Sequence, residues 1–116
     1  MNKKKIGISI GILQMIYGDR RALELAAEIG ADSVDFATHR FDRRTWDYRE
    51  PSSIYAQGDA AVIEHFSALG EYARSLGLTV GQTHGRGEGF LNDPAEDDAQ
   101  VENARLDLLA ASALGA

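Results

Sequence analysis

The feature of this sequence that most constrains its fold is an internal repeat, in which a helical segment passes through a glycine into a strand-like segment. Residues 26–34 (AAEIGADSV) in the first copy correspond to residues 73–80 (ARSLGLTV) in the second. The glycine follows the last apolar residue of each helical pattern, where helices commonly end on a left-handed residue. Strands that alternate with helices through such short turns predict parallel βαβ units.

The apolar pattern predicts three strands and three helices in alternation. Short apolar, β-branched runs mark the strands, at residues 5–10, 31–36 and 78–83. Apolar residues at helical spacing mark the helices, at residues 19–29, 59–76 and 95–114. Asp19 is the expected N-cap of the first helix, and Asp93 with Pro94 suits the entry to the third. The third helix is expected to bury one stripe, formed by Val101, Ala104 and Leu108 and widened by Leu106, Leu109, Ala110 and Ala113.

Strand-to-strand spacing of about 30 to 45 residues is normal for βαβ units. Eight such units would give about 250–350 residues, the usual size of a (β/α)8 barrel. We therefore predict an α/β fold in which residues 1–116 form the first three strand–helix units of such a barrel, lacking the later strands. The third helix runs into Leu114-Gly-Ala, the signature that introduces a strand in both earlier cycles. This favours a fragment over the alternative, a small three-layer open sheet.

The charge balance and composition exclude several classes of partner. A net charge of −6 argues against nucleic-acid binding, which needs a basic surface. No run approaches the ~20 apolar residues that cross a bilayer. The apolar stretch from Ile6 to Ile16 follows a basic start, but Gly7, Gly11 and Gln14 interrupt it, so we interpret it as strand and not as a signal peptide. Without cysteine there is no disulfide or thiolate metal site, and the cytoplasm is the expected compartment.

Residues 37–57 form one long connection after the second predicted strand. Structureless loops longer than about 12–15 residues are usually functional or disordered. This one contains Phe41, Trp46 and Tyr48, which indicates packing against another part of the molecule. It leaves the carboxyl end of a strand, the edge where barrels bind substrate. We therefore expect an active-site loop and not a disordered one.

Several segments resemble the sugar phosphate isomerase/epimerase family. Residues 71–93 (EYARSLGLTVGQTHGRGEGFLND) look like its third strand and loop, residues 30–36 (GADSVDF) like its second strand, and residues 102–116 are also similar. This family shares the xylose isomerase-like barrel with the apurinic-site endonucleases. The resemblance implies a divalent metal (Mn, Mg, Co or Zn) held by Glu, Asp and His of the later strands. It also implies that this chain alone does not hold the metal stably and is inactive.

His84 is the foremost candidate site residue. It ends the third predicted strand and precedes the glycine-rich segment 85–89, whose backbone can approach a ligand closely. Neutral imidazole suits a sugar hydroxyl or a divalent metal, and the family's equivalent histidine binds substrate in many members and a metal in the endonucleases. We expect substrate contact ahead of metal binding. The alternative is a strand-end histidine without a ligand.

Three further polar residues are candidates of lower rank. Asp35 shares a strand face with Ser33 and Ala37, so it would lie at the barrel mouth and accept hydrogen bonds from a polyol, or else pair with a neighbouring Arg or Lys. Arg86 suits a substrate phosphate or carboxylate, or is an exposed loop arginine. His39 is expected to be an exposed loop residue, and His65 a surface residue of the second helix.

The expected function is isomerisation or epimerisation of a sugar or sugar phosphate, by metal-assisted proton transfer beside a carbonyl. The substrate-binding residues would be His84, Asp35 and Arg86, which would orient hydroxyl and phosphate groups. Two alternatives remain: an apurinic-site endonuclease-like phosphodiesterase, and a non-catalytic fragment or binding module. Unpaired strand edges and uncovered helices would favour self-association.

Overall fold

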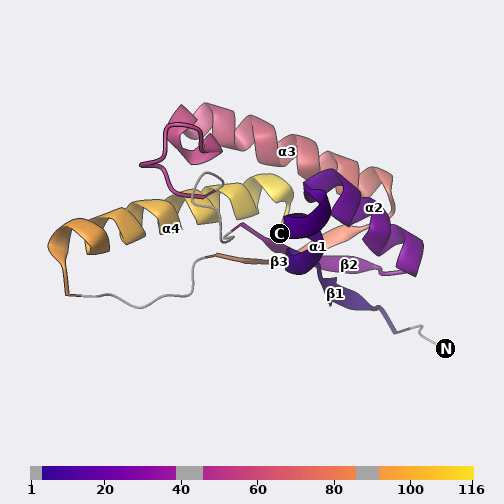
Figure 1. Cartoon of the computed structure of the whole chain (residues 1–116). Helices are drawn as coiled ribbons and strands as arrows, with labels where there is room; N and C mark the ends of the chain where they lie inside the picture. Colours follow the sequence, from indigo (N-terminus) through magenta and orange to yellow (C-terminus); the bar gives the residue numbers. More distant parts are fainter. Residues whose placement is uncertain (1–3, 39–45, 86–91) are drawn as a thin grey trace.

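The computed structural model describes residues 4–38, 46–85 and 92–116 and shows a three-stranded sheet with helices (Figure 1). The strands are β1 (Gly7–Ser9), β2 (Ser33–Ala37) and β3 (Thr79–His84). The helices are α1 (Gly11–Tyr17), α2 (Asp19–Ile29), α3 (Asp59–Ser75) and α4 (Pro94–Leu114), with a 3-10 turn, η2 (Ile54–Gln57).

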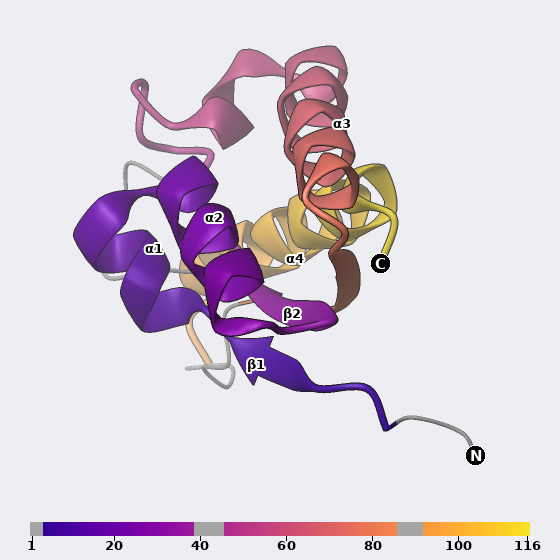
Figure 2. The ribbon, with the colours of Figure 1, turned by 90° about the vertical axis from the view of Figure 1, so that its right-hand side faces the viewer.

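The sheet is parallel, with strand order β1-β2-β3. The connection from β1 to β2 contains α1 and α2, and the connection from β2 to β3 contains η2 and α3. The predicted α/β class with parallel βαβ units is therefore confirmed. Figure 2 shows α1, α2 and α3 on the same side of β1 and β2.

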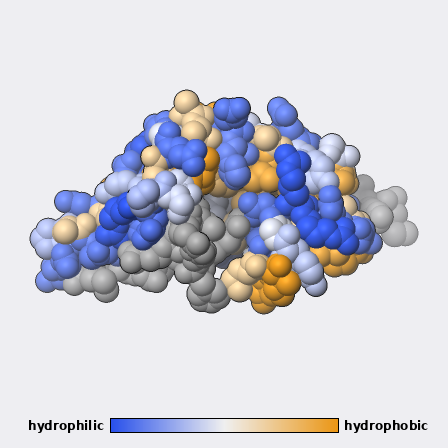
Figure 3. Space-filling model, turned by 45° about the horizontal axis from the view of Figure 1, so that its top comes forward, coloured by the Kyte–Doolittle hydropathy of each residue, from blue (hydrophilic) through white to orange (hydrophobic). Residues whose placement is uncertain are grey.

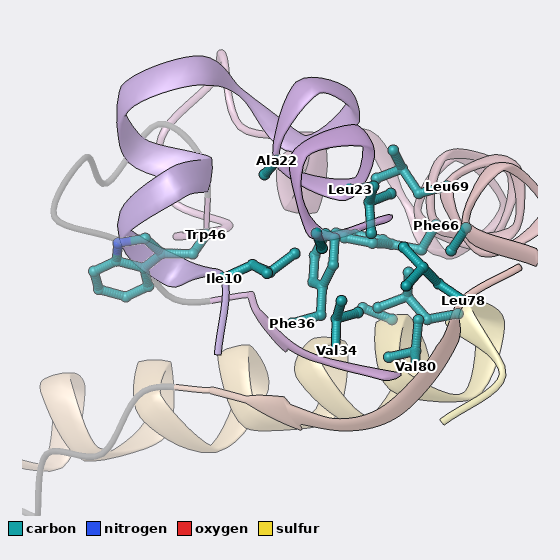
Figure 4. Packing of buried hydrophobic residues seen from close by; sticks show 14 of the residues in the cluster. Ile10, Ala22, Leu23, Val34, Phe36, Trp46, Phe66, Leu69, Leu78 and Val80 are labelled. Atoms are coloured by element: carbon teal, nitrogen blue, oxygen red, sulfur yellow. The ribbon is translucent and has the colours of Figure 1, made fainter. Parts of the chain in front are cut away.

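The core lies between the sheet and these helices (Figure 4). Val34 and Phe36 of β2 are at most 1% exposed and point toward the helices, and Val80 of β3 joins them. The ring of Phe36 meets the ring of Phe66 from α3 edge-on, with centroids 6.3 Å apart. Each such side chain contributes about 1.5–3 kcal/mol when removed from water, so this one-sided burial sets which strand residues face the helices.

The repeated glycine ends the helices as the sequence predicts. Gly30 follows α2 with φ 96°, and Gly77 follows the end of α3 with φ 80°. Residues with a Cβ rarely adopt this conformation, so glycine suits both turns. At the start of α4, the Asp93 side chain accepts a hydrogen bond from the Ala95 amide at 3.2 Å, which confirms the predicted entry.

The start of the chain differs from the prediction. The first strand ends at Ser9, and residues predicted to continue the apolar strand form the helix α1. Asp19 is not an N-cap: α2 is capped by Gly18, and Asp19 lies in the first turn, where its carboxylate accepts a hydrogen bond from Gln14 of α1. The reason is that α1 and α2 follow each other directly, so a glycine makes the sharp turn between them.

The predicted stripe of α4 was wrong in its main members. Val101 and Leu108 are 58% and 73% exposed, and Ala104 is exposed as well. Of the residues expected to widen the stripe, Leu106 and Ala110 are buried. The buried face also contains polar side chains, because α4 packs against the β2–α3 connection as well as α3. No helix in the described segments combines the length and apolar character needed to cross a bilayer.

The β2–α3 connection is anchored on α4 by polar contacts. The Tyr48 amide donates to the Asn103 side chain at 3.0 Å, and Asn103 donates in turn to Asp47 at 3.3 Å. Arg49 binds Asp47 at 2.9 Å and Glu96 of α4 at 2.8 Å. Trp46 is buried and Tyr48 packs against the core, as predicted for this connection, whereas Phe41 lies outside the described residues.

Asp47 is expected to contribute a stability that depends on pH. Burial alone would raise its pKa, but hydrogen bonds from Arg49 and Asn103 outweigh burial and hold the pKa well below its ordinary value. A depressed folded-state pKa contributes stability above the unfolded value, about 4, and this is lost as pH falls from about 5 toward the folded value. We expect Asp47→Asn to lower the free energy of unfolding by about 2 kcal/mol at pH 7, measured by urea denaturation. As the pH falls below about 5, the free energy of unfolding of the variant should decrease less than that of the unaltered protein.

Asp59→Asn is the matched control. Asp59 pairs with Arg105 on the surface, where both side chains are about half exposed, so solvent screens the pair. Its substitution is expected to change stability much less. Equal losses in the two variants would contradict the anchoring role of Asp47.

Candidate functional site

Polar side chains gather on the face of the sheet that lies opposite the core. Ser33, Asp35 and Ala37 alternate with the buried Val34 and Phe36, as the sequence predicts. In the described part of the chain this face borders a cavity of about 350 Å³. Its lining comes from all three strands: Gly7, Ile8, Ser9, Ser33, Val34, Asp35, Gly81 and Gln82.

A β-bulge in β3 brings two more polar side chains to this face. Val34 pairs with Val80, but Asp35 pairs with Gln82, so Gly81 is an extra residue in β3. Strict alternation from the buried Val80 would have pointed Gln82 and His84 toward the helices. The extra residue switches both side chains to the face of Asp35, which is how bulges commonly redirect side chains near functional sites.

Asp35 and His84 form the centre of the candidate site. Nδ1 of His84 lies 2.7 Å from the Asp35 carboxylate. That carboxylate also accepts hydrogen bonds from Nε2 of Gln82 at 2.9 Å and from the Ser9 hydroxyl at 3.2 Å. The Asp35 side chain is 12% exposed, whereas the His84 side chain is 67% exposed. The pair therefore has a partly buried acceptor and an imidazole open to solvent.

The surroundings of Asp35 favour its ionised form. Partial burial alone would raise its pKa, but the hydrogen bonds from Gln82, His84 and Ser9 outweigh burial and keep the pKa below its ordinary value. An ionised carboxylate can only accept hydrogen bonds, so the Nδ1 atom of His84 must carry a proton. In neutral imidazole the lone pair then lies on Nε2, which is able to accept a hydrogen bond from a ligand hydroxyl.

The predicted site residues are thus partly brought together. His84 and Asp35 meet at the carboxyl ends of adjacent strands, and among the described residues Asp35 is paired with His84, Gln82 and Ser9 and with no Arg or Lys. His65 is exposed on α3, as predicted, with its ring against Phe66. The predicted residues Arg86 and His39 lie outside the described residues.

Ser9 and Gln82 were not predicted as site residues from the sequence. Both are in line with Asp35 across the sheet, because Ser9 pairs with Asp35 in β1 and Gln82 pairs with it in β3. Ser9 could have been found from its place near the carboxyl end of the first strand. Gln82 could not, because its face depends on the bulge, for which an isolated strand glycine, Gly81, is the one available signal.

The described residues do not make a complete metal site. Across residues 4–38, 46–85 and 92–116, no three His, Cys, Asp or Glu side chains lie close enough together to hold an ion. Asp35 and His84 would supply two donors, whereas catalytic zinc takes three protein ligands. A zinc ion here would therefore need a donor from outside the described residues.

Comparisons with protein-family models, with curated proteins and with solved structures gave no match for this chain. The resemblance to sugar phosphate isomerases and epimerases therefore stays a prediction from the sequence segments that carry it.

Gln82→Met is expected to raise the pKa of Asp35 toward its ordinary value, because the substitution removes a hydrogen bond to the ionised form while keeping a similar volume. A pH titration of the Asp35 side-chain carboxyl carbon by NMR measures this midpoint. Gln57→Met, at an exposed position in η2, is the control and should leave the midpoint unchanged. An Asp35 midpoint that is the same in all three proteins would exclude Gln82 as a determinant.

Proposed function

We propose that this chain forms three strand–helix units of a (β/α)8 barrel that isomerises or epimerises a sugar or sugar phosphate. Parallel strands in sequential order, with α1, α2 and α3 on one side of β1 and β2, match the arrangement of strands and outer helices in such a barrel. The opposite face of the sheet would then line the barrel interior. Its polar side chains gather near the carboxyl ends of the strands, where barrel enzymes bind their substrates.

The observation that carries this proposal is the Asp35–His84 pair. Its 2.7 Å contact leaves Nε2 of an exposed imidazole as an acceptor at the carboxyl edge of the sheet. A sugar offers several hydroxyl donors, and one of them would bind Nε2 while Asp35 holds the ring in place. Arg86, in the segment after β3, is proposed to bind a phosphate of the substrate, as the sequence indicates.

This chain would orient the substrate and not carry the proton. The resemblance assigns the acid–base carboxylates and the metal to later strands, so the chain by itself is proposed to be inactive. Orientation of a bound hydroxyl still lowers the barrier in the complete site, because a fixed near-attack geometry replaces random encounter.

Sugar binding by the isolated chain tests the proposal. One or two net hydrogen bonds of about 1–1.5 kcal/mol each, with no enclosing walls, give a dissociation constant of roughly 5 to 200 mM. Titration with an aldose, a ketose and their phosphates, followed by amide NMR, should shift the signals of Asp35, Gln82 and His84 first. Tetrahydropyran, which has the ring of a pyranose without its hydroxyl groups, is the ligand control.

Two histidine variants sharpen this experiment. His84→Phe keeps a planar ring but removes the acceptor, and it should abolish the shifts at Asp35 and Gln82. His65→Phe changes an exposed histidine on α3, away from the sheet face, and should leave them intact. Shifts that persist in His84→Phe, or an absence of shifts at several hundred millimolar sugar, would refute the proposed role of this pair.

We also propose that the isolated chain self-associates. Within the described residues, β1 and β3 each have one unpaired edge, and Ile12 and Ile16 of α1 are 71% and 63% exposed. On the face drawn in Figure 3, hydrophobic areas lie between the hydrophilic ones, one of them at the lower edge. Unpaired strand edges and apolar patches both favour association.

Sedimentation velocity over a range of concentrations measures this association. A population of dimers or larger species that grows with concentration is expected, and Ile12→Lys with Ile16→Lys should reduce it. A single monomeric species at all concentrations would contradict the proposal.

A further inference from the structure

Gln14 is a buried polar residue in α1 whose side-chain amide is bound to the backbone of β2. It is 2% exposed. Its Oε1 accepts a hydrogen bond from the Ala37 amide at 2.9 Å, and its Nε2 donates to the Ala37 carbonyl at 3.1 Å. Nε2 also donates to the Asp19 carboxylate at 2.9 Å. Both N–H groups and the oxygen of the side chain are therefore used.

These bonds occur where β1 no longer pairs with β2. The register of the two strands ends at Ser9 opposite Asp35, and the last backbone bond runs from the Ile10 amide to the Asp35 carbonyl at 3.1 Å. One residue pair further along, the chain has turned into α1. A side-chain amide has the same donor and acceptor as a peptide group, so Gln14 replaces the missing strand beside Ala37.

The opposite side of Ala37 faces His84. Ala37 pairs with His84 in the ladder between β2 and β3. The amide and the hydroxyl of Thr38 both donate to the His84 carbonyl, at 2.9 and 3.1 Å. The end of β2 is therefore held between Gln14 and the backbone of the candidate ligand-binding histidine.

We propose that Gln14 is a positioning residue for the Asp35–His84 pair. Asp35 lies two residues before Ala37 on the same strand face. The position of the carboxyl end of β2 relative to β3 therefore sets the distance between the Asp35 carboxylate and the His84 imidazole. Without Gln14, its two hydrogen bonds to the Ala37 amide and carbonyl are lost, so the end of β2 is less constrained on the β1 side and can shift relative to β3. The ligand role of the pair rests on the proposed function, whereas its geometry does not.

The protonation state of the His84 ring provides the test, because it needs no sugar. In the unaltered protein, nitrogen NMR of the ring should show the proton on Nδ1 and the lone pair on Nε2. Gln14→Leu removes all three bonds at similar volume. It should mix the two neutral forms of His84 and accelerate hydrogen exchange of the Thr38 amide by about tenfold, the effect of losing one net hydrogen bond.

Two further variants separate positioning from simple destabilisation. Asn103→Leu removes a buried side-chain amide from α4. It should lower the free energy of unfolding without changing which ring nitrogen of His84 carries the proton. Gln14→Met likewise removes all three bonds but keeps an unbranched side chain, so its effect should match that of Gln14→Leu. It also decides the question if Gln14→Leu does not fold.

The proposal is overturned if the folded Gln14 variants keep the Nδ1-protonated ring, or if Asn103→Leu changes the ring to the same extent. If Gln14→Leu changes the protonated nitrogen of His84 but the unaltered protein binds no sugar, this inference stands and the proposed function is refuted.

Discussion

The structure depends on the one-sided burial of a parallel sheet. Val34, Phe36 and Val80 face the helices, and their removal from water fixes the orientation of β2 and of the first part of β3. Strand alternation then sends the intervening residues to the other face without any further specification. Asp35 lies on that face because its neighbours, Val34 and Phe36, face the core. The candidate site is thus a by-product of core packing, refined by a few polar contacts.

The parts of the fold that follow local rules could be predicted from the sequence. Gly30 and Gly77 mark helix ends because the backbone must turn left-handed there, and this needs no knowledge of the remainder of the molecule. The stripe of α4 could not be predicted by the same means. Apolar spacing alone does not show that the β2–α3 connection occupies one side of this helix, so Asn103 is buried while Leu108 is exposed. The helix α1 was missed because its apolar residues continue the pattern of a strand.

The candidate site divides in the same way. The proximity of Asp35 and His84 was accessible, since both end adjacent parallel strands whose carboxyl ends meet at one edge. Their side-chain contact was not, because it requires the extra residue Gly81 to reverse the alternation of β3. A bulge depends on the register between two strands and leaves little trace in the pattern of either one. Gln14 was hidden for a related reason, because a polar residue within an apolar run indicated an interruption and not a partner for the backbone.

The attachment of the β2–α3 connection to α4 has a consequence for the order of folding. Tyr55 donates to Asp107 at 2.5 Å across 52 residues of sequence, and Tyr48 reaches Asn103 across 55. Because α4 follows β3 in the chain, these contacts cannot form until all three strands have been synthesised. During synthesis, the connection leaves the ribosome well before the helix that anchors it. The β2–α3 connection, beside the carboxyl end of β2, therefore acquires its final conformation only after all three strands have been synthesised.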